Sequence, residues 1–317
     1  FINSLLSMYK NKIDFSKIPS KAGLKYKNAF ARRDIERIKA GVQTYEEFAK
    51  DETKTVNAGT LYPYEVVDKA TKVWTRRGWY DYILPPMDDT NRLMVNKYWD
   101  NLTDYFNGAT FNGIAVVDTS GSMTGNSASC PINVAISLGM YCAERAKGPF
   151  AGHYISFASR PQLIAVEGVD FCDKVKRIYQ TNLCDSTNIE AVFDLILDNA
   201  ISYHMSQDDL PQNVIIITDM EFDSACGFGY WGNNRGKDKL TLMEGIEKKF
   251  EAAGYKLPKL IFWNVDARQN NIPMLGNGPI SYVSGMSPAI FETIMSGKTG
   301  YELMMEKLDS PRYSVIG

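Results

Sequence analysis

Three oxygen-bearing side chains follow an apolar run near the middle of the chain. Residues 114–117 read IAVV, and Asp118, Ser120 and Ser122 come directly after them. Such a run is typical of a strand buried on both faces of a parallel sheet. A carboxylate and two hydroxyls at alternate positions, in a turn opened by Gly121, can surround one point. Because Mg2+ prefers oxygen ligands in octahedral geometry, the pattern predicts a divalent-cation site.

Two later segments supply further oxygen ligands. Residues 213–219 read NVIIITD, a second buried-strand pattern that ends at Asp219, and Thr187 directly precedes a predicted helix. In open parallel sheets, ligands bind where neighbouring strands end, so we expect the three segments to converge. Taken alone, the first segment has a simpler interpretation as an ordinary serine-rich loop.

The combined pattern, DxSxS followed by a Thr and then an Asp, resembles the von Willebrand factor type A domain and its metal-ion-dependent adhesion site. The matching residues run from about position 111 to the end. The resemblance implies that Ser120 and Ser122 bind Mg2+, Mn2+ or Ca2+ directly. It also implies that Asp118, Asp219 and Thr187 hold the ion directly or through water.

The chain departs from that pattern after the second aspartate. Many members of the family have Gly there, whereas this chain has Met220, followed by Glu221 and Asp223. The added carboxylates either strengthen cation binding or disfavour an acidic partner.

Length and composition place the chain among globular proteins. Its 317 residues suffice for one large α/β domain and a smaller part, and 44% of them are hydrophobic. No apolar run approaches the roughly 18 residues that span a bilayer, so we expect no membrane insertion. The odd number of cysteines, without CxxC spacing, favours reduced thiols and a cytoplasmic location. The five are Cys130, Cys142, Cys172, Cys184 and Cys226.

Residues 1–42 are basic although the whole chain has a net charge of −2. Ten Lys and Arg stand against three Asp and Glu, which gives 10 − 3 = +7, and aromatic residues are interleaved with them. Such a segment can bind RNA, but a solvated, partly extended arm is the favoured interpretation. Phe30, Ile35 and Ile38 predict one amphipathic helix over residues 28–40.

Residues 43–108 predict a small helical module. A helix is expected from Pro63 to about Trp74, and another over residues 91–106, capped by Thr90. Eight aromatic residues in this region are better explained by core packing than by a base-stacking platform. They are Trp74, Trp79, Tyr80, Tyr82, Tyr98, Trp99, Tyr105 and Phe106.

The remainder alternates strands and helices. This order predicts an α/β fold with a doubly wound, mainly parallel sheet, von Willebrand A or Rossmann-like, behind a small helical N-terminal part. We therefore divide the chain into residues 1–108 and 109–317. Beyond residues 114–117 and 213–219, strands are expected at 152–159, 162–166, 259–264 and 280–284, and helices at 131–147, 170–179, 188–205, 239–253, 288–295 and 299–308.

A helical part ahead of a type A domain is similar to the layout of the Ro RNA-binding proteins. It is also similar to an uncharacterised family in which a Leu-Tyr-Pro-like stretch precedes a DTSGSM loop, as residues 61–63 and 118–123 do here. The helical part is far shorter than the Ro ring, so the resemblance does not extend to ring-type RNA binding.

These observations predict a binding protein and not an enzyme. In this hypothesis a bound cation keeps one coordination position open, and an exposed Asp or Glu of a partner protein completes it. RNA binding by the basic N-terminal region, with the type A part as scaffold, is the alternative. A metal-dependent hydrolase ranks last, because Glu221 and Asp223 are the only general-base candidates beside the predicted site.

Overall fold

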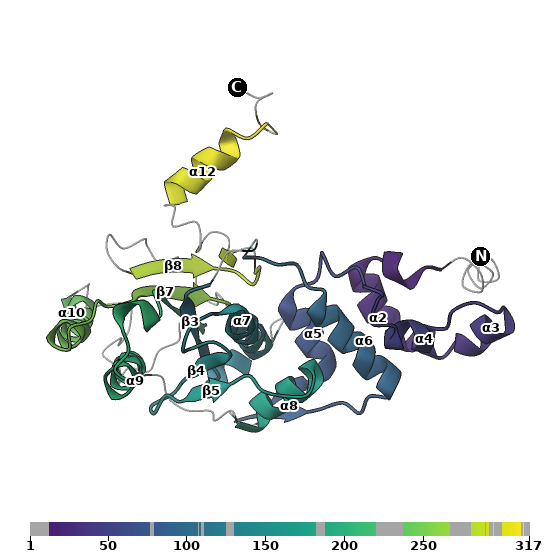
Figure 1. Cartoon of the computed structure of the whole chain (residues 1–317), viewed down its shortest axis with the longest axis horizontal. Coiled ribbons are helices and arrows are strands. Elements are labelled where there is room, and N and C mark those ends of the chain that lie inside the picture. The colour runs from purple at the N-terminus through teal and green to yellow at the C-terminus, as the bar shows by residue number, and fades with distance from the viewer. Residues whose placement is uncertain are drawn as a thin grey trace.

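A six-stranded sheet forms the centre of the computed structural model, which describes residues 13–76, 79–106, 108, 111–124, 130–181, 188–219, 237–266, 280–288, 290–291, 294, 300–311 and 313 (Figure 1). The strand order is β5-β4-β3-β6-β7-β8, and only β4 and β5 pair antiparallel. The predicted α/β, mainly parallel sheet is therefore confirmed. The strands are β3 (Gly113–Asp118), β4 (His153–Phe157), β5 (Leu163–Ala165), β6 (Asn213–Thr218), β7 (Lys259–Asn264) and β8 (Ile280–Ser284).

Helices cover both faces of this sheet. Alternate residues of the central strands face opposite sides, so each strand contributes to two separate apolar clusters. On one side lie α7 (Pro131–Arg145) and α8 (Phe171–Thr181), and on the other α9 (Ile189–Ser202) and α10 (Lys237–Ala252). Their predicted ends differ from the observed ones by no more than three residues.

The helix α7 is the most enclosed helix of the described chain. Of its 15 residues, 13 are buried, because the sheet covers one side and α5 covers another. Gly139 permits the close approach to β3, since a Cβ at that position would collide with the Val117 side chain. In contrast, α12 (Gly300–Leu308) extends away from the sheet in Figure 1, and Tyr301 is 68% exposed.

The N-terminal part is a folded helical module with one hairpin. It comprises η1 (Phe15–Lys17), α2 (Ser20–Ala31), α3 (Asp34–Lys39), α4 (Tyr45–Lys50), α5 (Pro63–Ala70), β1 (Lys72–Arg76), β2 (Trp79–Ile83) and α6 (Asp89–Asp100). Most of residues 13–42 thus lie in helices, so the interpretation as a partly extended arm is wrong for them. The buried Phe15 explains this, since its ring packs against Phe30, Tyr45 and Phe48.

The hairpin corrects the helix predicted to reach Trp74. The helix α5 ends at Ala70, and Thr71 is extended, with φ −145° and ψ 157°. The next residues then pair antiparallel with residues 79–83. Thr, Val and Trp favour strands, and a cross-strand partner lies close in sequence.

Further boundaries differ from the prediction, and the helix expected over 91–106 ends at Asp100. The helix predicted over 28–40 breaks between α2 and α3, and Ile35 and Ile38 are 59% and 66% exposed. Asp34 accounts for the break, because its carboxylate accepts hydrogen bonds from the first amides of α4. The cap of α6 is Asp88, which accepts from the Asn91 amide at 2.7 Å, and not Thr90.

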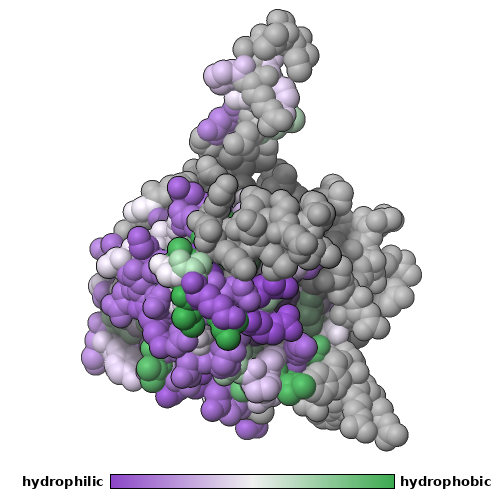
Figure 2. All heavy atoms as spheres, turned by 90° about the vertical axis from the view of Figure 1, so that its right-hand side faces the viewer, coloured by the Kyte–Doolittle hydropathy of each residue, from purple (hydrophilic) through white to green (hydrophobic). Residues whose placement is uncertain are grey.

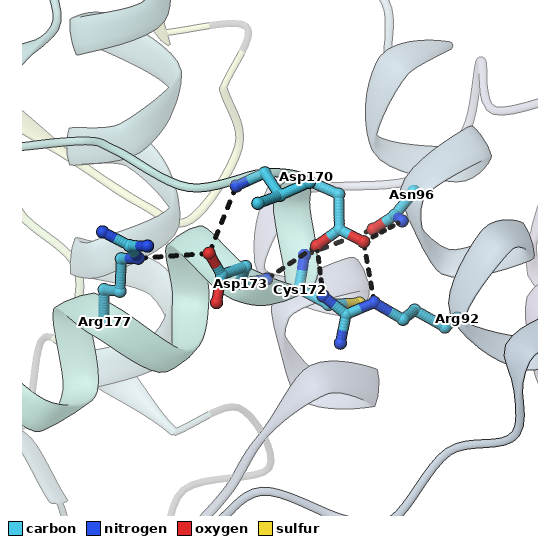
Figure 3. A network of polar contacts seen from close by, with 7 residues as sticks. Arg92, Asn96, Asp170, Cys172, Asp173 and Arg177 are labelled. Carbon is cyan, nitrogen blue, oxygen red and sulfur yellow. Dashed lines mark hydrogen bonds and ion pairs between the residues drawn. The ribbon is translucent and has the colours of Figure 1, made fainter.

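A polar junction connects the helical module to the α/β region (Figure 3). Arg92 of α6 forms two hydrogen bonds of 2.7 Å to the Asp170 carboxylate, which precedes α8, and Asn96 adds a third at 2.8 Å. Burial opposes ionisation of Asp170, but these bonds and the Asp173 amide lower its pKa overall. Nearby, Trp99 stacks on Phe171 with ring centroids 4.4 Å apart.

One apolar core runs across this junction. The same cluster contains Phe48, Val67 and Trp99 of the module together with Tyr141 and Trp263 of the α/β region. Among the eight aromatic residues singled out above, Tyr98, Trp99 and Phe106 are buried, and Tyr82 and Tyr105 pack against the core. The core-packing interpretation is confirmed for these five. The boundary at residues 108 and 109 stays a prediction.

Candidate functional site

The ends of β3 and β6 bring two buried aspartates to the same edge of the sheet. The strands pair parallel up to Val117 and Ile217, so Asp118 and Thr218 come next on each strand and Asp219 follows. Asp118 is fully buried and Asp219 is 5% exposed. From β3 the chain proceeds to β4 on one side, whereas β6 leads to β7 on the other. This reversal is the type of position where open α/β sheets bind ligands.

Neutral donors hold the Asp118 carboxylate in place. Its Oδ1 accepts from the Ser120 amide at 2.9 Å, and its Oδ2 accepts from the Thr218 hydroxyl at 2.6 Å. Thr218 was missed in the sequence, although in-register pairing of the two strand patterns would have placed it opposite Asp118. Because both oxygens are hydrogen-bonded, this carboxylate suits contact with a cation through water.

The two serine hydroxyls lie at a separation that suits one cation. A short turn, η2 (Gly121–Thr124), follows Ser120, and the Met123 amide donates to the Ser120 carbonyl at 3.1 Å. The turn places the Ser120 and Ser122 Oγ atoms 3.0 Å apart. Adjacent ligands of an octahedral Mg2+ with 2.0–2.1 Å bonds are about 2.9 Å apart. The pair therefore fits one edge of such an octahedron.

The structure brings together four of the five predicted ligands at this edge: Asp118, Ser120, Ser122 and, at the adjoining strand end, Asp219. Thr187 lies outside the described residues, as do Met220, Glu221 and Asp223. Among the described side chains, no three His, Cys, Asp or Glu gather as metal ligands. The predicted ligands that lie at this edge are two carboxylates and two hydroxyls.

Neighbouring elements enclose the serine turn. Both α7 and the β1–β2 hairpin contact η2. Cys130, which precedes α7, lies close enough to Asp68 and Asp266 for both carboxylates to act on it. Burial, followed by these weaker electrostatic effects, raises the pKa of Cys130. The thiol is thus protonated at neutral pH and is a poor nucleophile.

The basic N-terminal segment divides into buried and exposed cations. Lys27 is 8% exposed and Arg37 is 5% exposed, and the Arg37 guanidinium lies 4.5 Å from the Phe15 ring centre and donates to the Gln43 carbonyl. In contrast, Arg33 and Lys39 are exposed. Figure 2 views the molecule from the N-terminal end, where the described side chains are mostly hydrophilic. Only part of the positive charge counted in the sequence therefore reaches the surface.

None of the described helices has the length and apolar character needed to cross a bilayer.

The similar proteins include a viral relative and a bacterial solved structure. The chain is 32% identical over 312 residues to the uncharacterized protein L728 of Acanthamoeba polyphaga mimivirus. The match covers 94% of this chain and 50% of the viral protein, so the chain spans about half the length of that relative. The crystal structure of the Deinococcus radiodurans RO (RSR) protein matches 94% of this chain and 52% of its own, at 14% identity. Its TM-score of 0.40 is too low to carry residue roles from one protein to the other.

A family model matches residues 112–312, a range that contains β3, the serine turn and Asp219. Its description states no activity and no ligand. On this match the chain belongs to the family described as domain of unknown function DUF7788.

Proposed function

We propose that this chain is a binding module in which a divalent cation, Mg2+ in the first instance, captures an acidic residue of a partner protein. The observation that carries the proposal is the 3.0 Å separation of the Ser120 and Ser122 hydroxyls beside the buried Asp118. The ion would supply a positive centre that an external carboxylate can bind.

The chain's own residues have distinct roles in this proposal. Ser120 and Ser122 would provide direct oxygen ligands, and Thr187 would add a further one. Asp118 and Asp219 would balance the charge of the cation, and Asp118 keeps a fixed orientation through Thr218. Neutral hydroxyls leave the cation more positive than carboxylate ligands would, which favours an anionic partner.

Cation binding is tested with Mn2+, whose free form is counted by electron paramagnetic resonance. We expect wild-type protein to bind one Mn2+ that Mg2+ displaces. The double variant Ser120→Ala/Ser122→Ala should bind it at least about tenfold more weakly, since two ligands are lost. Thr53→Ala is the control, because it removes a hydroxyl that donates to Asp51 at 2.6 Å, far from this site in the sequence. Equal Mn2+ affinity in the serine variant would refute the metal site.

Partner capture is tested with a displayed random-peptide library selected in Mg2+ and eluted with chelator. Enrichment of Asp- or Glu-containing peptides on wild type, but not on Asp118→Ala, is the expected result. Circular dichroism checks that the variant remains folded. Peptides that stay bound in chelator would contradict the carboxylate mechanism even where Mn2+ binds.

RNA binding is the second candidate function, and the exposed cations at the N-terminal end favour it. Deleting residues 1–42 is a poor test, because Phe15 and Leu24 belong to the shared core. The substitutions Arg33→Glu/Lys39→Glu act on exposed side chains instead. If RNA binds there, affinity should fall in this variant and decrease steeply with salt, whereas chelation should have no effect.

A further inference from the structure

A second polar site lies in the helical module, and none of the predicted metal ligands that the structure describes lines it. A pocket of about 540 Å3 opens between α2, the end of α5 and the segment from Pro85 to Asn91. Its volume falls within the range of small-molecule sites, roughly 300–1,000 Å3. Neither the sequence patterns nor the metal proposal accounts for it.

Cationic side chains dominate the lining of this pocket. Five basic residues line it, namely Lys25, Lys27, Arg32, Lys69 and Lys72, whereas Asp68 and Asp88 are its acidic residues. The net formal charge of the lining is therefore 5 − 2 = +3. These cations come from three separate elements, α2, α5 and β1, so the fold and not one sequence run assembles them.

The two aspartates are already engaged by amides. Asp68 accepts from the Asn133 side chain at 2.5 Å, and Asp88 accepts from both the backbone and the side chain of Asn91. Among the described residues, neither forms an ion pair with a basic residue of the pocket. Within the described residues, these two carboxylates therefore do not neutralise the pocket's positive charge at ion-pair distance.

Among these cations, Lys27 gives the strongest indication that the pocket holds an anion. It is 92% buried, and its ammonium group donates to the Asn28 and Asn91 side-chain oxygens at 3.2 and 3.1 Å, which are neutral acceptors. An ammonium has three N–H donors. Burial, opposed by Asp88 and reinforced by nearby Lys69, lowers the pKa of Lys27. An anion in the pocket would offset this cost of burying the charge.

From the volume, the cation cluster and the buried lysine we infer that this pocket binds a compact phosphate-bearing anion. Lysine ammonium groups are common phosphate ligands, and several around one cavity match a multiply charged group better than a single carboxylate. Leu24, Ala31 and Met87 form an apolar part of the wall, which suits the organic portion of a phosphate ester. Over the described part of the chain, the pocket shares no residue with the proposed metal site.

Inorganic pyrophosphate is the probe, and isothermal titration calorimetry on the full chain is the measurement. We expect wild type to bind it, and Lys69→Gln/Lys72→Gln to bind it at least about tenfold more weakly, because two rim charges are lost. These rim positions avoid the buried Lys27, whose replacement threatens folding. Lys176→Gln/Lys248→Gln is the matched control, since both lysines are exposed and lie outside the pocket.

Two further titrations distinguish a small phosphate ligand from RNA. A nucleoside triphosphate should bind at least as tightly as pyrophosphate if the apolar wall contributes. A single-stranded 20-nucleotide RNA tests a continuous phosphate track instead. Absence of pyrophosphate binding at millimolar concentration, equal binding by the rim variant, or binding of RNA alone would each overturn the inference. Chelator should change none of these results, so failure here is distinct from failure of the metal proposal.

Discussion

The two regions of this chain bury charges of opposite sign. In the α/β region the buried charges include Asp118 and Asp219, which follow neighbouring strands. In the helical module they include Lys27 and Arg37, which donate to neutral oxygens. Burying a charge is costly unless hydrogen bonds or an opposite charge compensate it. A cationic ligand would offset the buried charge in one region and an anionic ligand would do so in the other, although the net charge is only −2. This difference is the physical basis of the two proposals.

The largest loss of stability is expected for a substitution in the core that the two regions share. Trp99→Ala removes a side chain that is 3% exposed, stacks on Phe171 and donates to Glu144 at 2.8 Å. We expect a loss of about 3–5 kcal/mol in the free energy of unfolding, in a single urea transition.

Circular dichroism and tryptophan fluorescence should report the same midpoint in that experiment. Tyr203→Ala is the control, because its side chain is 72% exposed and should change stability by no more than about 0.5 kcal/mol. Two separate transitions would show that the regions unfold independently, against the single core described here.

An intermediate effect is expected at the polar bridge between the regions. Asn133 of α7 donates to Asp68 at 2.5 Å and accepts from the Tyr179 hydroxyl. Asn133→Ala should cost about 2 kcal/mol near neutral pH, because both partners lose a buried hydrogen bond. Urea unfolding at about pH 7.5 and pH 5 is the measurement.

The sign of the pH dependence follows from Asp68. Burial raises the pKa of Asp68 above 3.8, and the bond from Asn133 lowers it part of the way back. Ionised Asp68 therefore costs stability above its folded pKa, and this cost disappears as pH falls toward the unfolded value. Losing Asn133 raises the folded pKa further, so the substitution should cost more at pH 7.5 than at pH 5. Asn199→Ala, which loses a local bond to Leu195, should show no such pH trend.

The smallest effect is expected at the outer edge of the helical module. Ile38 appeared in the sequence as part of an apolar helix face, yet it is 66% exposed. Ile38→Ser should change the free energy of unfolding by less than about 0.5 kcal/mol. A loss above about 1 kcal/mol in thermal or urea unfolding would mean that this face is covered in solution.

Much of the α/β region could be predicted from sequence because its signals are local. Residues 114–117 and 214–217 are apolar on both faces and completely buried, which leaves little choice of structure. The strand is followed directly by Asp118, Ser120 and Ser122. Their proximity could therefore be predicted from the sequence. The Thr218 hydroxyl bond to Asp118 was not, because it depends on the register between strands 100 residues apart.

The helical module was harder to predict because contacts distant in sequence decide its elements. Asp34 begins α3 and accepts hydrogen bonds from the first amides of α4, and Asp88 precedes the expected cap by two residues. Thr71 begins a strand whose stability depends on its partner at residues 79–83. Tertiary contacts outweigh intrinsic propensity at such positions. The phosphate pocket was equally hidden, since its lysines are scattered over three elements.

The burial of α7 limits where the chain can be cut into fragments that stay folded. Of the 15 residues of α7, 13 are buried, so the helix lies inside the protein. Removing α5 would expose an apolar face of α7 next to the serine turn. A recombinant fragment cut at the sheet is therefore expected to aggregate. The match to the viral relative covers 94% of this chain, so it extends beyond the sheet region.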